Sequence, residues 1–255
     1  MNELELKEHH LYVKKALREV ADILEAEHIP FFLIEGSALG AVREHDIIPW
    51  DDDVDLGVFL KDRDKVANLL KNGLSGEFTW KDMNTSDNYP RFFGKVLHEG
   101  FGCIDVFPLV KMPNNSYKRK LMWTERKVLF KLYKAHIGYS NSKENASLGG
   151  KIKLAFANVF SRFVSKKSLL RKKARMENRY ESRTDNVYYS NLYGAYKLER
   201  ELIKAEWIGD GVDQTFGDHT YKVFKDYDSY LRNLYGEYMT PLPPSERIVR
   251  HDEKF

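Results

Sequence analysis

Four aspartates fall within the five residues 51–55, and this concentration of carboxylates is the clearest sign of a functional site in the chain. From Asp53 onward, carboxylates alternate with the apolar residues Val54 and Leu56, and alternation with a period of two predicts a strand. Asp53 and Asp55 would then project side by side from one face of that strand. Carboxylates this close raise each other's pKa unless a cation lies between them. The pattern therefore predicts a divalent metal site with Asp53 and Asp55 as ligands.

Asp105 is the predicted third carboxylate. It stands alone in the apolar strand predicted at Cys103–Leu109, where an unpaired charge would be costly. A buried acid paired with a lysine or arginine is the alternative interpretation. Lys95, predicted in mid-strand beside the site, is expected to neutralise phosphate or else to lie on the surface. Asp51 joins the metal face if the strand begins early; otherwise Asp51 and Asp52 only cap the turn.

A phosphate-binding element is predicted just upstream of the aspartates. Gly36 and Ser37 precede a short helix predicted at Ala38–Arg43, and backbone amides at a helix start, together with the helix dipole, favour a phosphate. Arg43 lies one turn further, where a guanidinium would clamp that phosphate. Each signal is weak alone, but together with the acids they indicate metal-assisted phosphoryl or nucleotidyl transfer with Mg²⁺, or Mn²⁺ as the alternative.

Two of these segments, Gly36–Arg43 (GSALGAVR) and Ile48–Leu56 (IPWDDDVDL), resemble the signature of the LicD family. This family belongs to the nucleotidyltransferase superfamily and is related to the fukutin-related proteins. The resemblance continues at Ile104–Pro108 (IDVFP) and returns in the last thirty residues. It is weakest in the middle of the chain. The segment Glu44–Ile48 departs from the family pattern, so the donor contacts of this loop are expected to differ from those of the family.

The resemblance implies a reaction and a set of roles. Family members move a substituted phosphate, such as phosphocholine or a polyol phosphate, from a CDP-linked donor to a hydroxyl of a cell-surface glycan or its lipid-linked precursor, and CMP leaves. Lipopolysaccharide and teichoic acid are glycans of this kind. The implied metal ligands and catalytic acids are Asp53, Asp55 and Asp105, and the implied phosphate-binding residues are Gly36, Ser37 and Arg43. From the strand pattern, Asp51 is expected as an additional metal ligand and Lys95 as an additional phosphate-binding residue.

The pattern of elements predicts an α+β fold. We expect a nucleotidyltransferase-like small mixed sheet with flanking helices over residues 1–110, followed by a mainly helical, substrate-binding region over residues 111–255. The expected helices are Glu3–Glu27, Asp62–Lys71, Lys118–His136, Lys151–Val164, Ser168–Arg179 and Tyr227–Tyr235; the expected strands are Phe31–Ile34, Asp53–Phe59, Glu77–Met83, Arg91–Leu97, Cys103–Leu109, Val187–Leu192 and Thr220–Phe224.

The charge of the chain is uneven. The formal net charge is +3, yet nineteen Lys and Arg stand against three acids between Lys111 and Arg179. This basic region has three interpretations: a solvated helical surface, a patch that meets anionic lipid through residues 111–179, or a nucleic-acid surface. Basic charge supplies phosphate affinity, but no nucleic-acid module is recognisable.

The cysteine count and the distribution of apolar residues exclude several classes of protein. The chain has one cysteine, Cys103, which excludes a disulfide framework and any cysteine-rich zinc site. The polar start and the absence of a long apolar run favour a cytoplasmic protein, peripheral at the inner face of the cell membrane. The alternatives to phosphotransfer are a nucleotidyltransferase that moves NMP onto a small molecule or protein, and a non-catalytic membrane- or nucleic-acid-binding protein.

Overall fold

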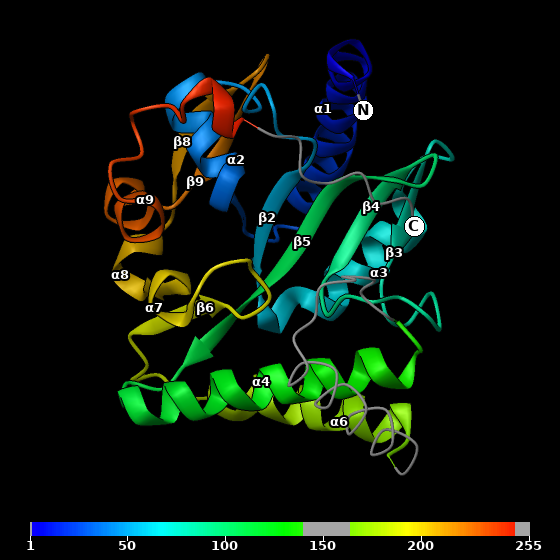
Figure 1. Ribbon diagram of the computed structural model, residues 1–255, viewed down its shortest axis with the longest axis vertical. Helices are drawn as coiled ribbons and strands as arrows, with labels where there is room; N and C mark the ends of the chain where they lie inside the picture. The colour runs from blue at the N-terminus through cyan, green and yellow to red at the C-terminus, as the bar shows by residue number, and fades with distance from the viewer. Residues whose placement is uncertain (1, 140–163, 248–255) are drawn as a thin grey trace.

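A mixed β-sheet forms the centre of the protein in the computed structural model, which describes residues 2–139 and 164–247 (Figure 1). Its strand order is β1-β2-β5-β4-β3, and β2 and β5 are parallel while the other neighbours in this order are antiparallel. The strands span Phe31–Leu33 (β1), Val54–Phe59 (β2), Phe78–Lys81 (β3), Gly94–His98 (β4) and Phe101–Met112 (β5). The α+β class with a small mixed sheet is therefore confirmed.

Strand β5 joins the two halves of the chain. This strand is twelve residues long. Its first part pairs with β4 on one side and with β2 on the other, and its last four residues pair with β6 (Tyr188–Asn191). Strand β6 in turn pairs with β7 (Leu202–Lys204). The boundary expected at residue 110 falls inside β5, so strands from both expected regions contribute to one sheet.

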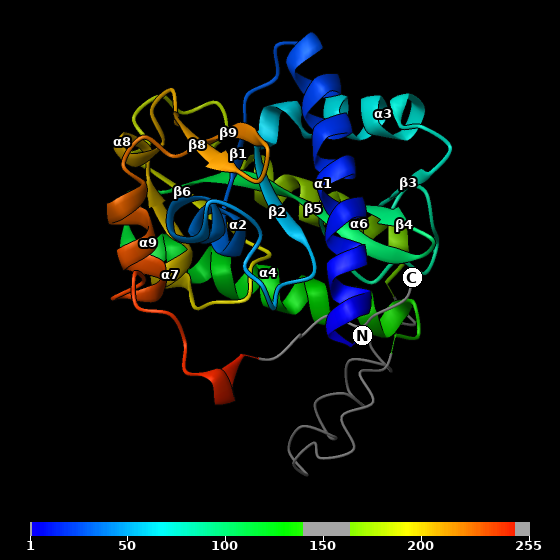
Figure 2. The same cartoon turned by 90° about the horizontal axis from the view of Figure 1, so that it is seen from above.

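Helix α1 (Glu3–Ala26) packs against β5 and α3 (Arg63–Gly73) and crosses in front of the sheet when seen from above (Figure 2). Its start is fixed by a capping box. The Asn2 side chain accepts hydrogen bonds from the N–H groups of Leu4 and Glu5, and the Glu5 carboxylate accepts one of 2.7 Å from the N–H of Asn2, which satisfies donors that a helix start leaves open. The face of α1 that includes Val13, Leu17, Val20 and Leu24 is buried, as its apolar period predicts.

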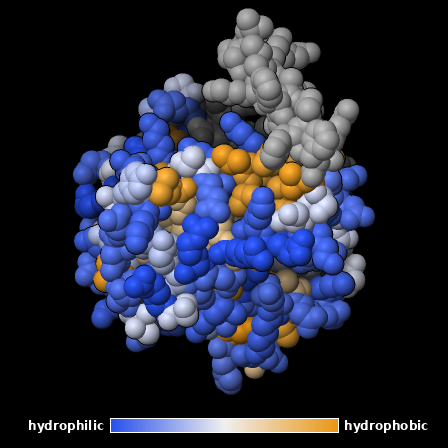
Figure 3. Space-filling view, turned by 90° about the horizontal axis from the view of Figure 1, so that it is seen from below, coloured by the Kyte–Doolittle hydropathy of each residue, from blue (hydrophilic) through white to orange (hydrophobic). Residues whose placement is uncertain are grey.

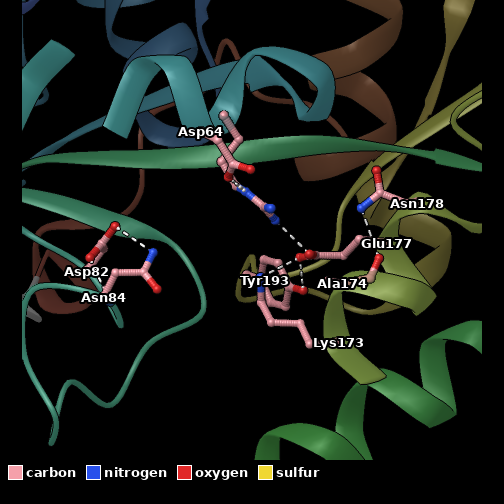
Figure 4. Close-up of polar contacts among 9 residues, drawn as sticks. Asp64, Asp82, Asn84, Lys173, Ala174, Glu177, Asn178 and Tyr193 are labelled. Carbon is pink, nitrogen blue, oxygen red and sulfur yellow. Dashed lines mark hydrogen bonds and ion pairs between the residues drawn. The ribbon is translucent and has the colours of Figure 1, made fainter. Parts of the chain in front are cut away.

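Helices α4 (Ser116–His136) and α6 (Lys166–Glu177) pack on each other at the lower end of the molecule in Figure 1. A buried polar cluster ties this layer to α3 and to the loop after β6. The fully buried Glu177 carboxylate accepts hydrogen bonds from Arg63 (2.7 Å) and from the Tyr193 hydroxyl, and forms an ion pair of 2.7 Å with Lys173. Figure 4 shows Lys173 and Tyr193 pointing toward Glu177. Pairing of this kind is what allows charges to be buried.

The last part of the chain is less helical than expected. After the short helices α7 (Leu198–Glu201) and α8 (Ala205–Ile208), a hairpin of β8 (Val212–Phe216) and β9 (His219–Val223) packs beside β1. Strand β8 was not predicted because its sequence, VDQTF, is largely polar and carries no long apolar run. Helix α9 (Tyr227–Tyr235) has the predicted bounds.

The chain enters its second helix earlier than predicted. Helix α2 begins at Glu35 and ends at Leu39, and a π-helical turn continues it over Gly40–Glu44. Gly36 and Ser37 therefore lie inside the helix, and the predicted break at these residues was wrong. The chain turns one residue sooner because Glu35 adopts a left-handed φ of 46°.

Two expectations from the sequence concern apolar helices: the predicted helix Lys151–Val164 and the absence of a helix that could span a membrane. The predicted helix Lys151–Val164 lies, except for its last residue, outside the described residues. Within residues 2–139 and 164–247, no helix is both long enough and apolar enough to cross a membrane.

Candidate metal centre and its cavity

Three neighbouring strands place two carboxylates and one ammonium group in a single row. Asp55 on β2 is the register partner of Asp105 on β5, and Asp105 is in turn the partner of Lys95 on β4. Asp53 precedes β2 by one residue and, by the strand period, shares the face of Asp55. Asp53, Asp55 and Asp105 each offer a carboxylate oxygen within 4.8 Å of the others. The structure thus brings together the three acids that the sequence singled out.

The charged groups of this cluster act strongly on one another. Lys95 forms an ion pair with Asp105, and its Nζ lies 3.8 Å from an oxygen of Asp53. Burial, reinforced by the negative charges of Asp53, Glu35, Asp105 and Asp51, holds the pKa of Asp55 well above its usual range. A buried carboxylate with this environment is stabilised as an anion only when more positive charge arrives. Three carboxylates whose oxygens converge in this way form a centre that suits a divalent cation.

A second group of acids lies next to the first. Asp51, Asp52 and Asp53 also offer oxygens within 4.8 Å of one another. Asp52 and Asp53 are buried and Asp51 is half-buried. Asp53 belongs to both groups. Because β2 begins only at Val54, the early strand start on which the role of Asp51 depended is not observed, and this role stays a prediction.

Helix α1 fixes the loop that carries these aspartates. The His10 Nε2 lies 2.6 Å from the carbonyl oxygen of Asp51, and the His9 Nε2 lies 2.8 Å from that of Asp52 and 3.1 Å from that of Gly102. A carbonyl only accepts, so Nε2–H is the donor in each case. Burial lowers the pKa of His10, which favours the neutral ring. The sequence analysis missed both residues, whose signal was a histidine pair within an otherwise amphipathic helix.

Gly36 and Ser37 shape the acidic centre from α2. A Cβ on Gly36 would lie 2.8 Å from Oδ2 of Asp51 and 4.0 Å from Oδ2 of Asp55, so glycine allows these carboxylates to approach the helix. The Ser37 hydroxyl accepts a hydrogen bond of 2.7 Å from the N–H of Asp55, and the Ser37 N–H donates to Ile34 O (3.0 Å). Ser37 does not line the cavity; it positions Asp55.

Arg43 faces the cavity but is anchored. Its Nη1 donates a hydrogen bond of 2.9 Å to the carbonyl oxygen of Tyr238, and its Nε donates one of 2.7 Å to Glu44. The guanidinium therefore links the π-helical turn to the segment after α9. Its predicted contact with phosphate stays a prediction.

The acidic centre opens into a cavity of about 760 Å³. The residues around it come from both ends of the chain and from its middle, and they divide by chemistry. The acidic wall contains Glu35, Asp51, Asp52, Asp53, Asp55 and Asp105, and the remaining lining includes the cations Arg43, Arg91, Lys95, Arg126 and Lys134 and the aromatic residues Trp50, Phe92, Phe93, Phe107, Phe130, Tyr193, Tyr196, Tyr235 and Tyr238.

Glu35 is a cavity residue that the sequence analysis missed. It is buried, its N–H donates a hydrogen bond of 3.0 Å to the Tyr230 hydroxyl, and its carboxyl accepts one from Asn191. Burial, reinforced by the charge of Asp105, raises the pKa of Glu35 to about 7. A left-handed φ at a residue other than glycine is strained, and such strain concentrates at functional sites. The only signal in the sequence was an acid at the end of the apolar run FFLI.

Glu35 has a second buried acid beside it. A Cβ at Gly194 would overlap the carboxyl oxygens of both Glu35 and Glu201, so these two groups converge on the same point. The pKa of Glu201 lies well above its usual range because of burial and of the charge of Glu35. Two acids so placed are not both ionised at low cost.

The fold and the site together define an α+β protein with a carboxylate centre, suited to a divalent cation, at the wall of a large polar and aromatic cavity. Residues 28–144 match the nucleotidyltransferase domain of LicD, FKTN and FKRP. This segment, slightly less than half of the chain, is therefore similar to the LicD-family nucleotidyltransferase domain, and it contains the aspartates and Gly36 of the centre.

Two relatives illustrate the range of the family. The chain is 22% identical over 269 residues to the lipopolysaccharide cholinephosphotransferase LicD of Haemophilus influenzae, a match that covers 98% of this chain and 97% of the relative. It is 32% identical over 123 residues to the human ribitol 5-phosphate transferase FKRP, a match that covers 45% of this chain but only 23% of the human protein. Both relatives are named as transferases of a phosphate-bearing group.

Proposed function

We propose that the protein is a metal-dependent phosphotransferase that moves phosphocholine or a polyol phosphate from a CDP-linked donor to a hydroxyl of a cell-surface glycan or its lipid-linked precursor. The observation that carries this proposal is the cluster of Asp53, Asp55 and Asp105, which lies in a cavity large enough for a nucleotide and within the segment that matches the LicD family. The names of the two relatives support the class of transferred group.

In this proposal Asp53, Asp55 and Asp105 hold Mg²⁺ or Mn²⁺, with Asp51 in support. A cation bound by these residues would neutralise the diphosphate of the donor. Arg43 supplies positive charge in the lining of the cavity, and Gly36 lets the carboxylates of Asp51 and Asp55 approach α2. The acceptor oxygen forms a bond to the phosphorus that carries the substituent, the bond from that phosphorus to the oxygen of CMP breaks, and a carboxylate of the centre accepts the hydroxyl proton.

The alternative reaction is nucleotidyl transfer. The acceptor would then attack the phosphorus attached to cytidine, so NMP would be incorporated and the substituted phosphate would leave. Incubation with CDP-choline, CDP-ribitol or CDP-glycerol, Mg²⁺ and a glycan acceptor separates the two by mass spectrometry. We expect free CMP and an acceptor heavier by the substituted phosphate. An acceptor that gains CMP, or turnover that is intact in Asp53→Asn, would show the proposal to be wrong.

A matched control for this assay is Asp210→Asn. Asp210 is exposed and is not a lining residue of the cavity, so its substitution removes one carboxylate at no expected loss of activity. A non-catalytic binding protein predicts a different result: ligand binding that survives Asp53→Ala and Asp55→Ala, and no turnover with any metal.

We further propose that α4 and α6 rest on the anionic inner face of the cell membrane, where a lipid-linked acceptor would be found. This face is mostly hydrophilic with apolar side chains gathered on it (Figure 3), and α4 exposes Tyr117, Leu121 and Val128 among its basic residues. Basic residues with exposed apolar ones favour anionic bilayers. Sedimentation with vesicles should require phosphatidylglycerol and fall with salt; equal binding to phosphatidylcholine vesicles would exclude this contact.

A further inference from the structure

One face of α4 forms a basic and aromatic wall of the cavity. Arg126, Phe130 and Lys134 follow one another at intervals of four residues and all line the cavity, as residues on one side of a helix must. Arg91, in the segment before β4, adds a further positive charge to the lining. In Figure 1, α4 lies in the lower part of the molecule and α2 in the upper part, so this wall is distinct from the α2 side of the acidic centre.

Arg126 has a buried N–H for which the described part of the chain provides no acceptor. Its guanidinium lies 4.1 Å from the centre of the Trp123 ring, and its Nε is buried and donates to no atom of the residues that the structure describes. A buried N–H without an acceptor is unfavourable. Burial also lowers the pKa of Arg126, against the smaller effects of Tyr193 and Glu201. An anion bound at this guanidinium would satisfy the donor and stabilise the charge.

The neighbours of Arg126 suit a sugar. Lys134 Nζ lies 4.6 Å from the centre of the Phe130 ring, and Phe92 and Tyr193 pack edge to face with their ring centres 5.6 Å apart. Tyr193 is held from behind by its hydrogen bond to the buried Glu177 (Figure 4). Phe92 is buried and packs behind Phe130 and Tyr193. The half-buried rings of Phe130 and Tyr193 line the cavity and offer it flat apolar surfaces, while the cations beside them select for a negative group.

We propose that Arg126, with Lys134 and Arg91, forms a subsite for a phosphate or carboxylate carried by the acceptor, so that the acceptor is an anionic saccharide rather than a neutral one. This inference rests on the proposed function. The donor's phosphates belong at the aspartate centre, where the cation would lie.

The test measures binding without turnover. Glucose 6-phosphate, glucuronate, glucose and inorganic phosphate are titrated separately into the protein by calorimetry at low ionic strength, and CDP with Mg²⁺ is titrated as the donor probe. We expect glucose 6-phosphate or glucuronate to bind at least about tenfold more tightly than glucose, which corresponds to about 1.4 kcal/mol. Raising the salt concentration should weaken this binding.

Variants of α4 assign the site. Arg126→Gln should weaken glucose 6-phosphate binding at least tenfold, Arg126→Lys should recover part of it, and Lys131→Gln should leave it unchanged because Lys131 is exposed on α4 and is not a lining residue. The affinity of Arg126→Gln for CDP with Mg²⁺ should stay within about twofold of the wild-type value. An equal loss of CDP affinity would assign the anion to the donor and overturn the inference, as would unchanged sugar-phosphate binding in Arg126→Gln or binding of glucose as tight as that of its phosphate.

The controls separate this inference from the proposed function. Asp53→Asn should abolish the Mg²⁺-dependent part of CDP binding and leave glucose 6-phosphate binding intact. If no CDP-linked donor releases CMP, the proposed function fails while the subsite is still judged by the titrations. Thermal unfolding of Arg126→Gln and Arg126→Lys establishes that both variants are folded before affinities are compared.

Discussion

Asp55 and Asp105 are register partners across the parallel pair of β2 and β5, although fifty residues separate them in the chain. Parallel neighbours place equivalent residues side by side, so the two carboxylates meet on one face of the sheet. Lys95 is the next residue in the same row. Lys95, which forms an ion pair with Asp105, is therefore the cation that the described strands place in this row, and the neighbouring carboxylates raise the pKa of Asp55.

Removing one carboxylate should stabilise the metal-free protein. Asp55→Asn retains the size of the side chain and eliminates a charge that its neighbours oppose. We expect the free energy of unfolding in EDTA to rise by about 1 kcal/mol, and the stabilisation given by Mg²⁺ to disappear. Urea unfolding with and without Mg²⁺ measures both. The control Asp210→Asn should change neither, and a destabilised Asp55→Asn protein would argue against charge repulsion in the cluster.

Removing the lysine should have the opposite effect. Lys95 is buried with its ammonium against Asp105 and near Asp53, and loss of one partner leaves buried charge uncompensated. Lys95→Met should lower the free energy of unfolding in EDTA by about 3 kcal/mol. Mg²⁺ should restore part of this loss because the cation replaces the missing charge. If Mg²⁺ protects Lys95→Met less than it protects the wild type, the lysine is itself required to bind the metal.

Gly36→Ala should separate stability from binding. Gly36 lies within α2 and its φ is not left-handed, so alanine would favour the helix by up to about 1 kcal/mol. The new Cβ would meet Oδ2 of Asp51 at 2.8 Å and displace that carboxylate. We expect unfolding to be unaffected or slightly more difficult, with weaker binding of Mg²⁺ and CDP. Titration calorimetry checks this; an unchanged affinity would mean that Asp51 does not contribute.

Glu35 should give the metal-free protein a pH dependence near neutrality. Its folded pKa of about 7 exceeds the ordinary value of 4.5, so the folded state binds the proton more tightly than the unfolded state does. The corresponding stabilisation is fully present below pH 4.5 and is lost as the pH rises to about 7. The loss should be of the order of 3 kcal/mol at most.

Urea unfolding in EDTA at a series of pH values measures this effect. Glu35→Gln keeps an oxygen that accepts from Asn191 but does not titrate, so it should flatten the profile between pH 4.5 and 7. The remaining slope belongs to Asp55 and Glu201, whose pKa values are also raised. A profile as steep as that of the wild type would exclude Glu35 as its source.

The sequence by itself determined the elements and the acids of the centre. Local patterns suffice for this: the apolar periods of α1 and α9 fix a helix and its buried face, and the alternation after Asp53 fixes a strand with carboxylates on one side. Asp105 was recognisable because an acid in an apolar strand needs a partner. The helices and strands that were missed or displaced, such as β8 and the start of α2, have polar sequences or an unusual backbone angle.

Only the tertiary structure decided how those residues work together. Strand register, which no local pattern specifies across fifty residues, aligned Asp55, Asp105 and Lys95. Chain packing brought His9 and His10 to the aspartate loop, turned Ser37 into a support for Asp55, and buried Glu35 beside Glu201. The roles of these residues depend on burial and on neighbours distant in sequence, since both set the pKa of an acid and the partners of a donor. The buried Nε of Arg126, which has no acceptor among the described residues, is likewise recognisable only from the folded structure.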